Sequence, residues 1–295
     1  MFPVTVRHRT SYRYASPVTF GEHRLMLRPR DSHDLRLVRA GLTLSPRASV
    51  RWFHDVFGNS VALATFDEPS SELTIESVLD IERYPRDPER LSLTDQARSY
   101  PFIYSADDRT DLGGLLARHY PDPRGSVEDW ARQFVEGPSM GTLDLLRAVN
   151  DAIRTRFAYA ARDTEGTNAP DVTLAAGSGS CRDFALLMME ALRCLGFGAR
   201  FVSGYLYDAS LDRGGEAVTG SGQTHAWVDV YLPGAGWVEF DPTNGVVDAD
   251  ALIRIAATRD PSQAVPVAGS FVGRPADPLG MTVSVQVERR RTPGG

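Results

Sequence analysis

Cys181 is one of two cysteines in the chain, and it directly follows the flexible segment Gly177-Ser178-Gly179-Ser180. Apolar side chains then recur at helical spacing, at Ala185, Met188, Met189 and Leu192. The pattern predicts a helix that begins at Cys181, where unpaired backbone N–H groups and the positive end of the helix dipole stabilise a thiolate. Cys181 is therefore a candidate nucleophile.

A buried, unreactive side chain is the commoner role of a cysteine, and Cys194 fits that role. It lies near the predicted C-terminal end of the same helix, among Leu192, Leu195 and Phe197. On one helix the Cα atoms of the two cysteines lie roughly 20 Å apart, whereas those of a disulfide lie about 4.4–6.8 Å apart. We expect neither an internal disulfide nor a zinc site, because two cysteines alone make a poor ligand set.

His225 begins a predicted strand, His225–Leu232, directly after the segment Gly220-Ser221-Gly222-Gln223. A free thiol with a pKa of about 8.5 is mostly protonated at neutral pH, so a thiol nucleophile needs a base such as imidazole. The other histidines lie in the N-terminal part of the chain or, for His119, in a linker, which leaves His225 as the base available to Cys181. The alternative is a histidine that only forms a hydrogen bond at a strand end.

Asp241 ends the next predicted strand, Gly236–Phe240, which follows the turn Pro233-Gly234-Ala235-Gly236. A hairpin sets the start of its first strand against the end of its second, so Asp241 is expected beside His225. A carboxylate there accepts the imidazole N–H and fixes the tautomer of the ring. Asp-Pro-Thr-Asn is also ordinary turn chemistry. Taken together, the three positions converge by topology and predict a catalytic triad of Cys181, His225 and Asp241.

The elements that must position this triad follow an α+β order. Residues 1–85 alternate apolar and polar side chains in short runs separated by turn residues, which predicts a small N-terminal β-sandwich domain. The expected strands are Val4–Tyr14, Arg24–Leu27, Leu35–Leu44, Val50–His54, Val61–Phe66 and Leu73–Ile81. No catalytic pattern stands out in this region.

Two stretches flank the predicted catalytic core. Residues 86–125 are rich in proline and aspartate and predict a linker with one short helix near Leu112–His119. Residues 271–295 form a C-terminal extension, in which the alternation over Met281–Val287 predicts an edge strand.

The predicted catalytic core spans residues 126–270. Its helices come first: Ser126 with Asp129 resembles a capping box, and Thr142 opens a stronger amphipathic helix. The strands follow the helix of Cys181, beginning with Ala199–Leu206. This order predicts helices followed by an antiparallel sheet.

The composition is that of an ordinary globular chain of 295 residues, with 42% hydrophobic and 24% charged residues. A net charge of −6 argues against a nucleic-acid binder, because phosphates require a basic surface. The chain contains no lysine, which excludes a Schiff-base lysine, lysine-bound pyridoxal phosphate and a P-loop lysine. We expect no cofactor and no metal.

No run of 18 or more apolar residues occurs, so we expect no membrane partner and no membrane span. The first residues, Met1–Arg9, lack the apolar stretch of a secretory signal, and we expect a cytoplasmic protein. The composition leaves a homo-oligomer open.

Three ordered segments resemble the bacterial transglutaminase-like family, part of the wider papain-like group. They are Gly179-Ser180-Cys181-Arg182-Asp183-Phe184-Ala185, His225–Tyr231 and Trp237–Asn244. Arg193–Arg200 and Ser203-Gly204-Tyr205 fit as well, and the β-region resembles the domain that often precedes this core. The resemblance covers most of the chain and implies a papain-like or transglutaminase-like core behind a β-domain.

The resemblance implies that Cys181 is the nucleophile, His225 the general base and acid, and Asp241 the orienting carboxylate. Asp229 stands where the family frequently has glutamate, a departure expected to affect packing rather than the triad. The Gly-rich segment Asp208–Gly222, directly before His225, is a candidate lid over the cleft.

The implied chemistry is acyl transfer through a thioester on Cys181, whose backbone N–H helps to hold the oxyanion. We favour a cysteine peptidase or amidase that hydrolyses a peptide or isopeptide amide of a peptide or protein substrate, because water is abundant and nothing marks an amine site. Transfer from a protein glutamine to an amine, and a non-catalytic binding protein on the same fold, stay open.

Overall fold

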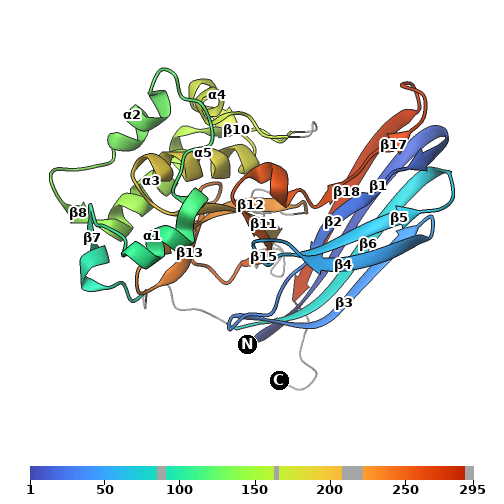
Figure 1. Cartoon of the computed structure of the whole chain (residues 1–295), viewed down its shortest axis with the longest axis horizontal. Coiled ribbons are helices and arrows are strands. Elements are labelled where there is room, and N and C mark those ends of the chain that lie inside the picture. The colour runs from blue at the N-terminus through green and yellow to red at the C-terminus, as the bar shows by residue number, and fades with distance from the viewer. Residues whose placement is uncertain (85–90, 163–165, 208–221, 290–295) are drawn as a thin grey trace.

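The computed structural model describes residues 1–84, 91–162, 166–207 and 222–289. It contains a β-domain and, beside it, a mixed unit of helices and strands (Figure 1). Among the described residues, no helix is long and apolar enough to cross a membrane.

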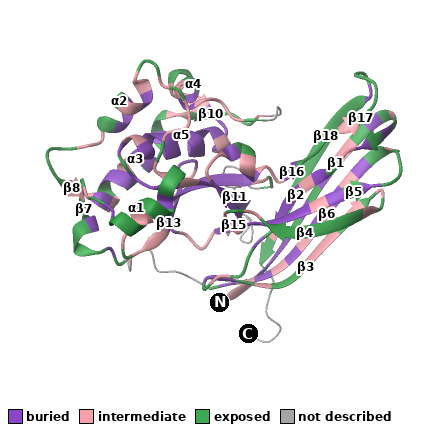
Figure 2. Ribbon diagram, in the orientation of Figure 1, coloured by how far each residue is buried: buried purple, intermediate pink, exposed green. Residues whose placement is uncertain are grey.

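Two antiparallel sheets form the β-domain. One contains three long strands of the N-terminal region: β1 (Phe2–Phe20), β6 (Ser70–Arg83) and β3 (Leu35–Ser45). The other contains the remaining three: β2 (His23–Arg28), β5 (Ser60–Phe66) and β4 (Ala48–His54). Side chains from both sheets share one buried cluster, with Tyr14 and Ile75 from the first and Leu25 and Ala64 from the second. Much of β3 and β4 is exposed on its outer face (Figure 2).

Strands from the C-terminal part of the chain complete these sheets. They are β16 (Val267–Ala268), β17 (Phe271–Val272) and β18 (Pro278–Arg289). β18 runs antiparallel to β1, from the pair Val4–Arg289 to the pair Tyr14–Pro278, and covers the predicted strand Met281–Val287. The β-domain is therefore built from both ends of the described chain, which the alternation within each stretch does not reveal.

The helices belong to the mixed unit. They are α1 (Ala106–Leu112), α2 (Ser126–Arg132), α3 (Thr142–Arg156), α4 (Pro170–Ala176) and α5 (Cys181–Cys194), with 3-10 turns at Asp95–Arg98, Gly113–Leu115 and Pro261–Ala264. Two short strand pairs connect them: β7 (Ser99–Tyr100) with β8 (Met140–Gly141), and β9 (Ala158–Tyr159) with β10 (Ser178–Gly179). Thr142 and Cys181 open helices as predicted.

The short helix predicted near Leu112–His119 was misplaced, because the structure has it at Ala106–Leu112. Ser105 caps this helix: its hydroxyl accepts a hydrogen bond from the Asp108 N–H at 3.0 Å. The predicted segment contains two adjacent glycines, which disfavour an α-helix, and only a 3-10 turn forms at Gly113–Leu115.

The capping box predicted at Ser126 and Asp129 is wrong. Ser126 is the first helical residue of α2, and the capping residue is Gly125. The Asp122 carboxylate accepts hydrogen bonds from the Val127 and Glu128 N–H groups at 3.0 and 3.2 Å. An acid four residues upstream thus takes the place that the local pattern assigned to Ser126.

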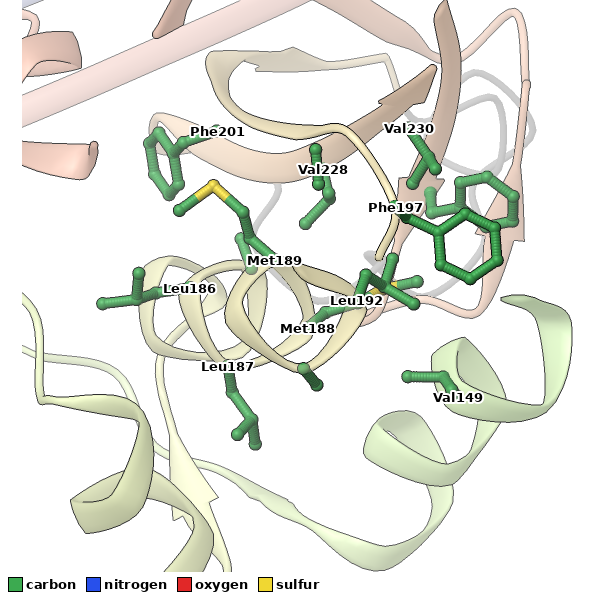
Figure 3. Close-up of a cluster of buried hydrophobic side chains, with 14 of the residues drawn as sticks. Val149, Leu186, Leu187, Met188, Met189, Leu192, Phe197, Phe201, Val228 and Val230 are labelled. Atoms are coloured by element: carbon green, nitrogen blue, oxygen red, sulfur yellow. The ribbon is translucent and has the colours of Figure 1, made fainter. Parts of the chain in front are cut away.

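The sheet of the mixed unit has the order β14-β13-β12-β11-β15. Its strands are β14 (Val246–Val247), β13 (Gly236–Asp241), β12 (His225–Leu232), β11 (Ala199–Leu206) and β15 (Leu252–Thr258). Helix α5 packs on β11 and β12, and Figure 3 shows Met189 next to Phe201 and Val228, with Val149 of α3 on the other side of the helix. Burial of these apolar side chains holds α5, and hence Cys181, against the sheet.

The opposite face of this sheet packs against the β-domain. Tyr205 of β11 and Ile253 of β15 join Val6 of β1 and Ile81 of β6 in one buried cluster. The Asn59 side chain adds two hydrogen bonds of 2.9 Å across the interface, one to the Ala257 carbonyl and one from its N–H. The β-domain is therefore joined to the sheet that carries His225 and Asp241.

Candidate active site

Cys181 is the first residue of α5, and only 6% of its surface is exposed. The parallel pair of β9 and β10 fixes the backbone just before it. Gly179 is needed at this approach, since a Cβ there would lie 2.8 Å from the Asp183 Cβ. The Cys181 N–H lies in the first turn, where no intrahelical acceptor exists.

Asp183 holds this helix start in place. It forms a capping box with Ser180: its carboxylate accepts hydrogen bonds from the Ser180 N–H at 2.9 Å and the Ser180 hydroxyl at 2.8 Å. The same buried carboxylate pairs with Arg162 at 3.2 Å and accepts the Asn168 N–H at 2.6 Å. Asp183 therefore links Arg162 and Asn168 to Ser180, the residue directly before Cys181.

His225 and Asp241 meet as the hairpin predicts. His225 Nε2 lies 2.8 Å from Asp241 Oδ2, and both side chains are fully buried. The hairpin register pairs Val228 with Phe240 and Leu232 with Gly236. The centroid of the Trp227 ring lies 6.1 Å from that of the His225 ring, with the ring planes tilted by 31°.

Asp241 is held by further donors. Its Oδ1 accepts the Thr243 N–H at 2.9 Å, and its Oδ2 accepts the Asn244 side-chain amide at 2.8 Å. Burial alone would raise the pKa of Asp241, but the His225 charge and these hydrogen bonds lower it below its ordinary value. Asp241 is therefore a carboxylate at neutral pH.

The charge of Asp241 also sets the protonation of His225. Burial alone would lower the pKa of His225, but the Asp241 carboxylate and contacts with Cys181 raise it to about 10. Nε2 donates to Asp241, so Nδ1 is the nitrogen left for Cys181. Nδ1 is buried and has no partner at hydrogen-bonding geometry within the described part of the chain. An imidazolium thus lies beside the sulfur at neutral pH, which favours a thiolate nucleophile.

A cleft of about 340 Å³ opens onto Cys181. Residues from around the triad line it: Tyr159, Arg162, Gly166, Ser180, Arg182, Gln223 and Thr224. Met281 and Val283 of β18 form its far wall, so the β-domain contributes to the cleft. A second cavity, lined by Arg83, Arg200 and Arg254 among others, lies elsewhere and includes no triad residue.

The structure brings Cys181, His225 and Asp241 together as the sequence predicts, while their catalytic roles stay predictions. Sequence reasoning assigned no role to Asp183, although the spacing of Ser180 and Asp183 is that of a capping box. It also missed Tyr159, whose pKa is raised by burial and by the neighbouring Cys181 charge. Tyr159 is placed by the pairing of β9 with β10, which leaves no local pattern.

Asp229 takes part in packing and ion pairing away from the triad. It is fully buried on β12 and pairs with Arg200 at 2.9 Å and with Arg254 at 3.8 Å. The predicted lid, Asp208–Gly222, lies outside the described residues except for Gly222. Among the residues that the structure describes, no group of three or more His, Cys, Asp or Glu could hold a metal ion.

Two family models match the chain. Residues 4–82 match the bacterial transglutaminase-like N-terminal region, and residues 128–242 match the transglutaminase-like superfamily. An uncharacterized protein of Mycobacterium bovis is 31% identical over 278 residues, which cover 90% of this chain and 86% of that protein.

Two further similarities are more limited, the first in the share of the chains that it covers and the second in sequence identity. The protein-glutamine gamma-glutamyltransferase of Pseudomonas aeruginosa is 30% identical over 142 residues, which cover 47% of this chain and 21% of that protein. A solved structure of a candidate cysteine protease from Cytophaga hutchinsonii superimposes with a TM-score of 0.73 at 18% identity, covering 99% of this chain and 91% of that one. The second similarity shows a shared fold over both units.

Proposed function

Because the chain belongs to the transglutaminase-like superfamily and carries its bacterial N-terminal region, we propose that it is a thiol-dependent acyl-transfer enzyme, a cysteine peptidase or amidase. One observation carries the proposal. His225 donates Nε2–H to the buried Asp241 carboxylate at 2.8 Å, which leaves Nδ1 as the ring nitrogen for Cys181, the first residue of α5. The substrate is a peptide or protein amide, and no cofactor takes part.

The first half-reaction forms a thioester. The Cys181 sulfur attacks the amide carbonyl carbon, and the Cys181 N–H at the start of α5 donates to the oxyanion. When the C–N bond breaks, the His225 imidazolium gives its proton to the leaving amine. Asp241 keeps the ring oriented throughout and stabilises its charged form.

The second half-reaction releases the acyl group. Neutral His225 takes a proton from water as water attacks the thioester carbonyl, and the C–S bond then breaks to leave the Cys181 thiolate beside the His225 imidazolium. The products are a carboxylic acid and the thiolate–imidazolium pair from which the cycle began. Hydrolysis is the simplest outcome, because water is abundant and none of the described residues that line the cleft identifies a binding site for an amine acceptor.

Transfer to an amine is the second candidate. The local similarity to a protein-glutamine gamma-glutamyltransferase favours it, since an amine can attack the same thioester in place of water. A non-catalytic binding protein is less well supported, because Cys181, His225 and Asp241 are all present, His225 is hydrogen-bonded to Asp241 at 2.8 Å, and Cys181 is among the groups that raise the pKa of His225.

The test uses a library of peptidyl aminocoumarin amides, with and without added dansylcadaverine. Wild type and Cys194→Ala are expected to release aminocoumarin, and Cys181→Ala to lose about 10³-fold of that rate or more. A free acid identifies a hydrolase, and a dansylated acyl product identifies a transferase. Equal release by wild type and Cys181→Ala would contradict the proposal.

A further inference from the structure

A row of apolar side chains on one face of β18 runs from the domain interface into the cleft. Val285 is 4% exposed and packs in the interface cluster with Tyr205 and Ile253. Two and four residues earlier on the same face, Val283 is 36% exposed and Met281 is 45% exposed, and both line the cleft of Cys181. The row is therefore buried at Val285 and exposed at Val283 and Met281, where it lines the cleft of Cys181.

The backbone of this row faces outward, away from β1. The Val285 N–H donates a hydrogen bond of 3.1 Å to the Gly222 carbonyl, so the outer edge of β18 at Val285 is already paired. N–H and C=O groups of alternate strand residues point to the same side. Val283 and Met281 therefore also direct their N–H and C=O groups to this edge.

The partner at Val285 connects this edge to the triad. Gly222 lies three residues before His225, and the intervening Gln223 and Thr224 line the cleft as well. Beyond Gly222, none of the described residues pairs with the edge at Val283 or Met281. Within the described part of the chain, an apolar strand edge without a backbone partner at Val283 and Met281 thus borders the cleft of Cys181.

We propose that the substrate peptide binds as an extended strand added to the outer edge of β18, with backbone hydrogen bonds to Val283 and Met281. This inference rests on the proposed function, and it assigns substrate recognition to the β-domain. Strand addition recognises main chain through hydrogen bonds and reads alternate side chains through pockets. The exposed Val283 and Met281 side chains select an apolar substrate residue, because they bury apolar surface only against such a residue.

The test compares two labels for Cys181, iodoacetamide and the peptide probe acetyl-Val-Ala-Val chloromethyl ketone, by second-order rate constants. Val283→Pro removes an outward N–H and loses no hydrogen bond to β1, which is the position in an edge strand where proline is tolerated. We expect it to lower the peptide-probe rate about tenfold and to leave the iodoacetamide rate within about twofold. Val283→Ala is the matched control: it keeps the N–H and is expected to lose about threefold or less.

The outcomes separate this inference from the proposed function. Equal peptide-probe rates for wild type and Val283→Pro would overturn strand addition and leave the nucleophile intact. An iodoacetamide rate at Cys181 no higher than at Cys194 would overturn the proposed function itself. If thermal unfolding shows that Val283→Pro does not fold, wild type is tested with probes N-methylated at each amide in turn. A fall of about tenfold at one amide or more supports strand addition, and rates within about twofold at all of them overturn it.

Discussion

The two cysteines lie at opposite ends of helix α5, and their surroundings favour opposite protonation states of the two thiols. Cys181 opens the helix beside the His225 imidazolium and faces a cleft. Cys194 closes the helix, half-buried against the apolar core. The helix dipole favours a thiolate at the first position and disfavours it at the last.

Burial and nearby carboxylates at Cys194 strengthen this contrast. Burial raises the pKa of Cys194 to about 11; Arg118 opposes this rise, and the carboxylates of Glu128, Glu190 and Asp122 add to it. Two buried charges that complement the helix dipole act against the contrast: Asp183 lies at the N-terminal end of α5, and Arg193, paired with Glu190 at 2.7 Å, lies at the C-terminal end. Position on the helix, rather than residue type, therefore predicts which thiol is the nucleophile. The ratio of labelling rates at the two cysteines measures the difference.

The largest expected effect is that ratio in wild type. With a pKa of about 11, Cys194 is a thiolate in roughly one molecule in 10⁴ at pH 7. We expect iodoacetamide to label Cys181 about 100-fold faster than Cys194, measured by peptide mass spectrometry. A ratio near one would show that the ends of α5 do not differ as their surroundings predict.

Removing the imidazole is expected to reduce the ratio next most strongly. His225→Ala should lower Cys181 labelling at pH 7 about 30-fold, since the thiolate loses its neighbouring cation. The Cys194 rate should not change. His119→Ala is the matched control, because His119 lies near the other end of α5, where its backbone N–H donates to Glu190 at 3.0 Å and is kept in the variant. A similar loss in both variants would point to general destabilisation instead of a specific pair.

Removing the charge of Asp241 is expected to have a smaller effect that depends on pH. In Asp241→Asn, burial acts on His225 without a compensating carboxylate, so its pKa should fall from about 10 to 6.5 or lower. The imidazolium is then scarce at pH 7.5, and Cys181 labelling there should fall about tenfold. NMR titration of the ring measures the pKa directly. A fall of less than one unit in the pKa of His225 would show that Asp241 does not set the charge of His225.

His8 gives an internal reference for that titration. It is buried in the β-domain, and burial lowers its pKa to about 4. Its ring bonds only hydroxyl groups, those of Tyr205 and Thr10, each at 2.8 Å. In Asp241→Asn, His225 should approach the behaviour of His8, whose own pKa should stay unchanged.

The same substitution should change stability in a defined pH window. The raised pKa of His225 contributes stability below pH 6.5 that is lost as pH rises through about 10. The lowered pKa of Asp241 contributes stability above pH 3.8 that is lost as pH falls through its lowered value. Wild type and Asp241→Asn should therefore differ most in unfolding temperature between pH 3.8 and 6.5 and converge toward pH 10. A difference that grows with alkaline pH would contradict this assignment.

The triad could be predicted from the sequence because each residue lies at a boundary that leaves a local pattern. Cys181 starts a helix, His225 starts a strand, and Asp241 ends the strand paired with it. The far wall of the cleft could not be predicted in this way. β18 is assigned to the β-domain by its pairing with β1, and residues almost a chain length apart leave no local pattern. For Met281 and Val283 the sequence therefore predicts an edge strand of the C-terminal extension and no place in the cleft.

The two Ser-x-x-Asp segments show the same limit on a shorter scale. Ser126 and Asp129 fit the capping pattern but do not form the box, because Asp122 already accepts the N–H groups of α2. Ser180 and Asp183 form the box, and Asp183 also binds Arg162 and the Asn168 N–H. The pattern identifies candidates, and competing side chains from outside the segment decide between them.

This pair of segments provides the smallest expected effect. Asp183→Ala removes the cap and leaves Arg162 without its partner, which should cost on the order of 2 kcal/mol of stability in urea unfolding. Asp129→Ala, at an exposed position of α2, should cost about 0.5 kcal/mol or less. Because the start of α5 loosens, Cys181 labelling in Asp183→Ala should fall about threefold while Cys194 labelling holds. If stability falls but the labelling ratio does not, Asp183 holds the helix without helping the thiolate, and the contrast between the ends of α5 rests on His225 alone.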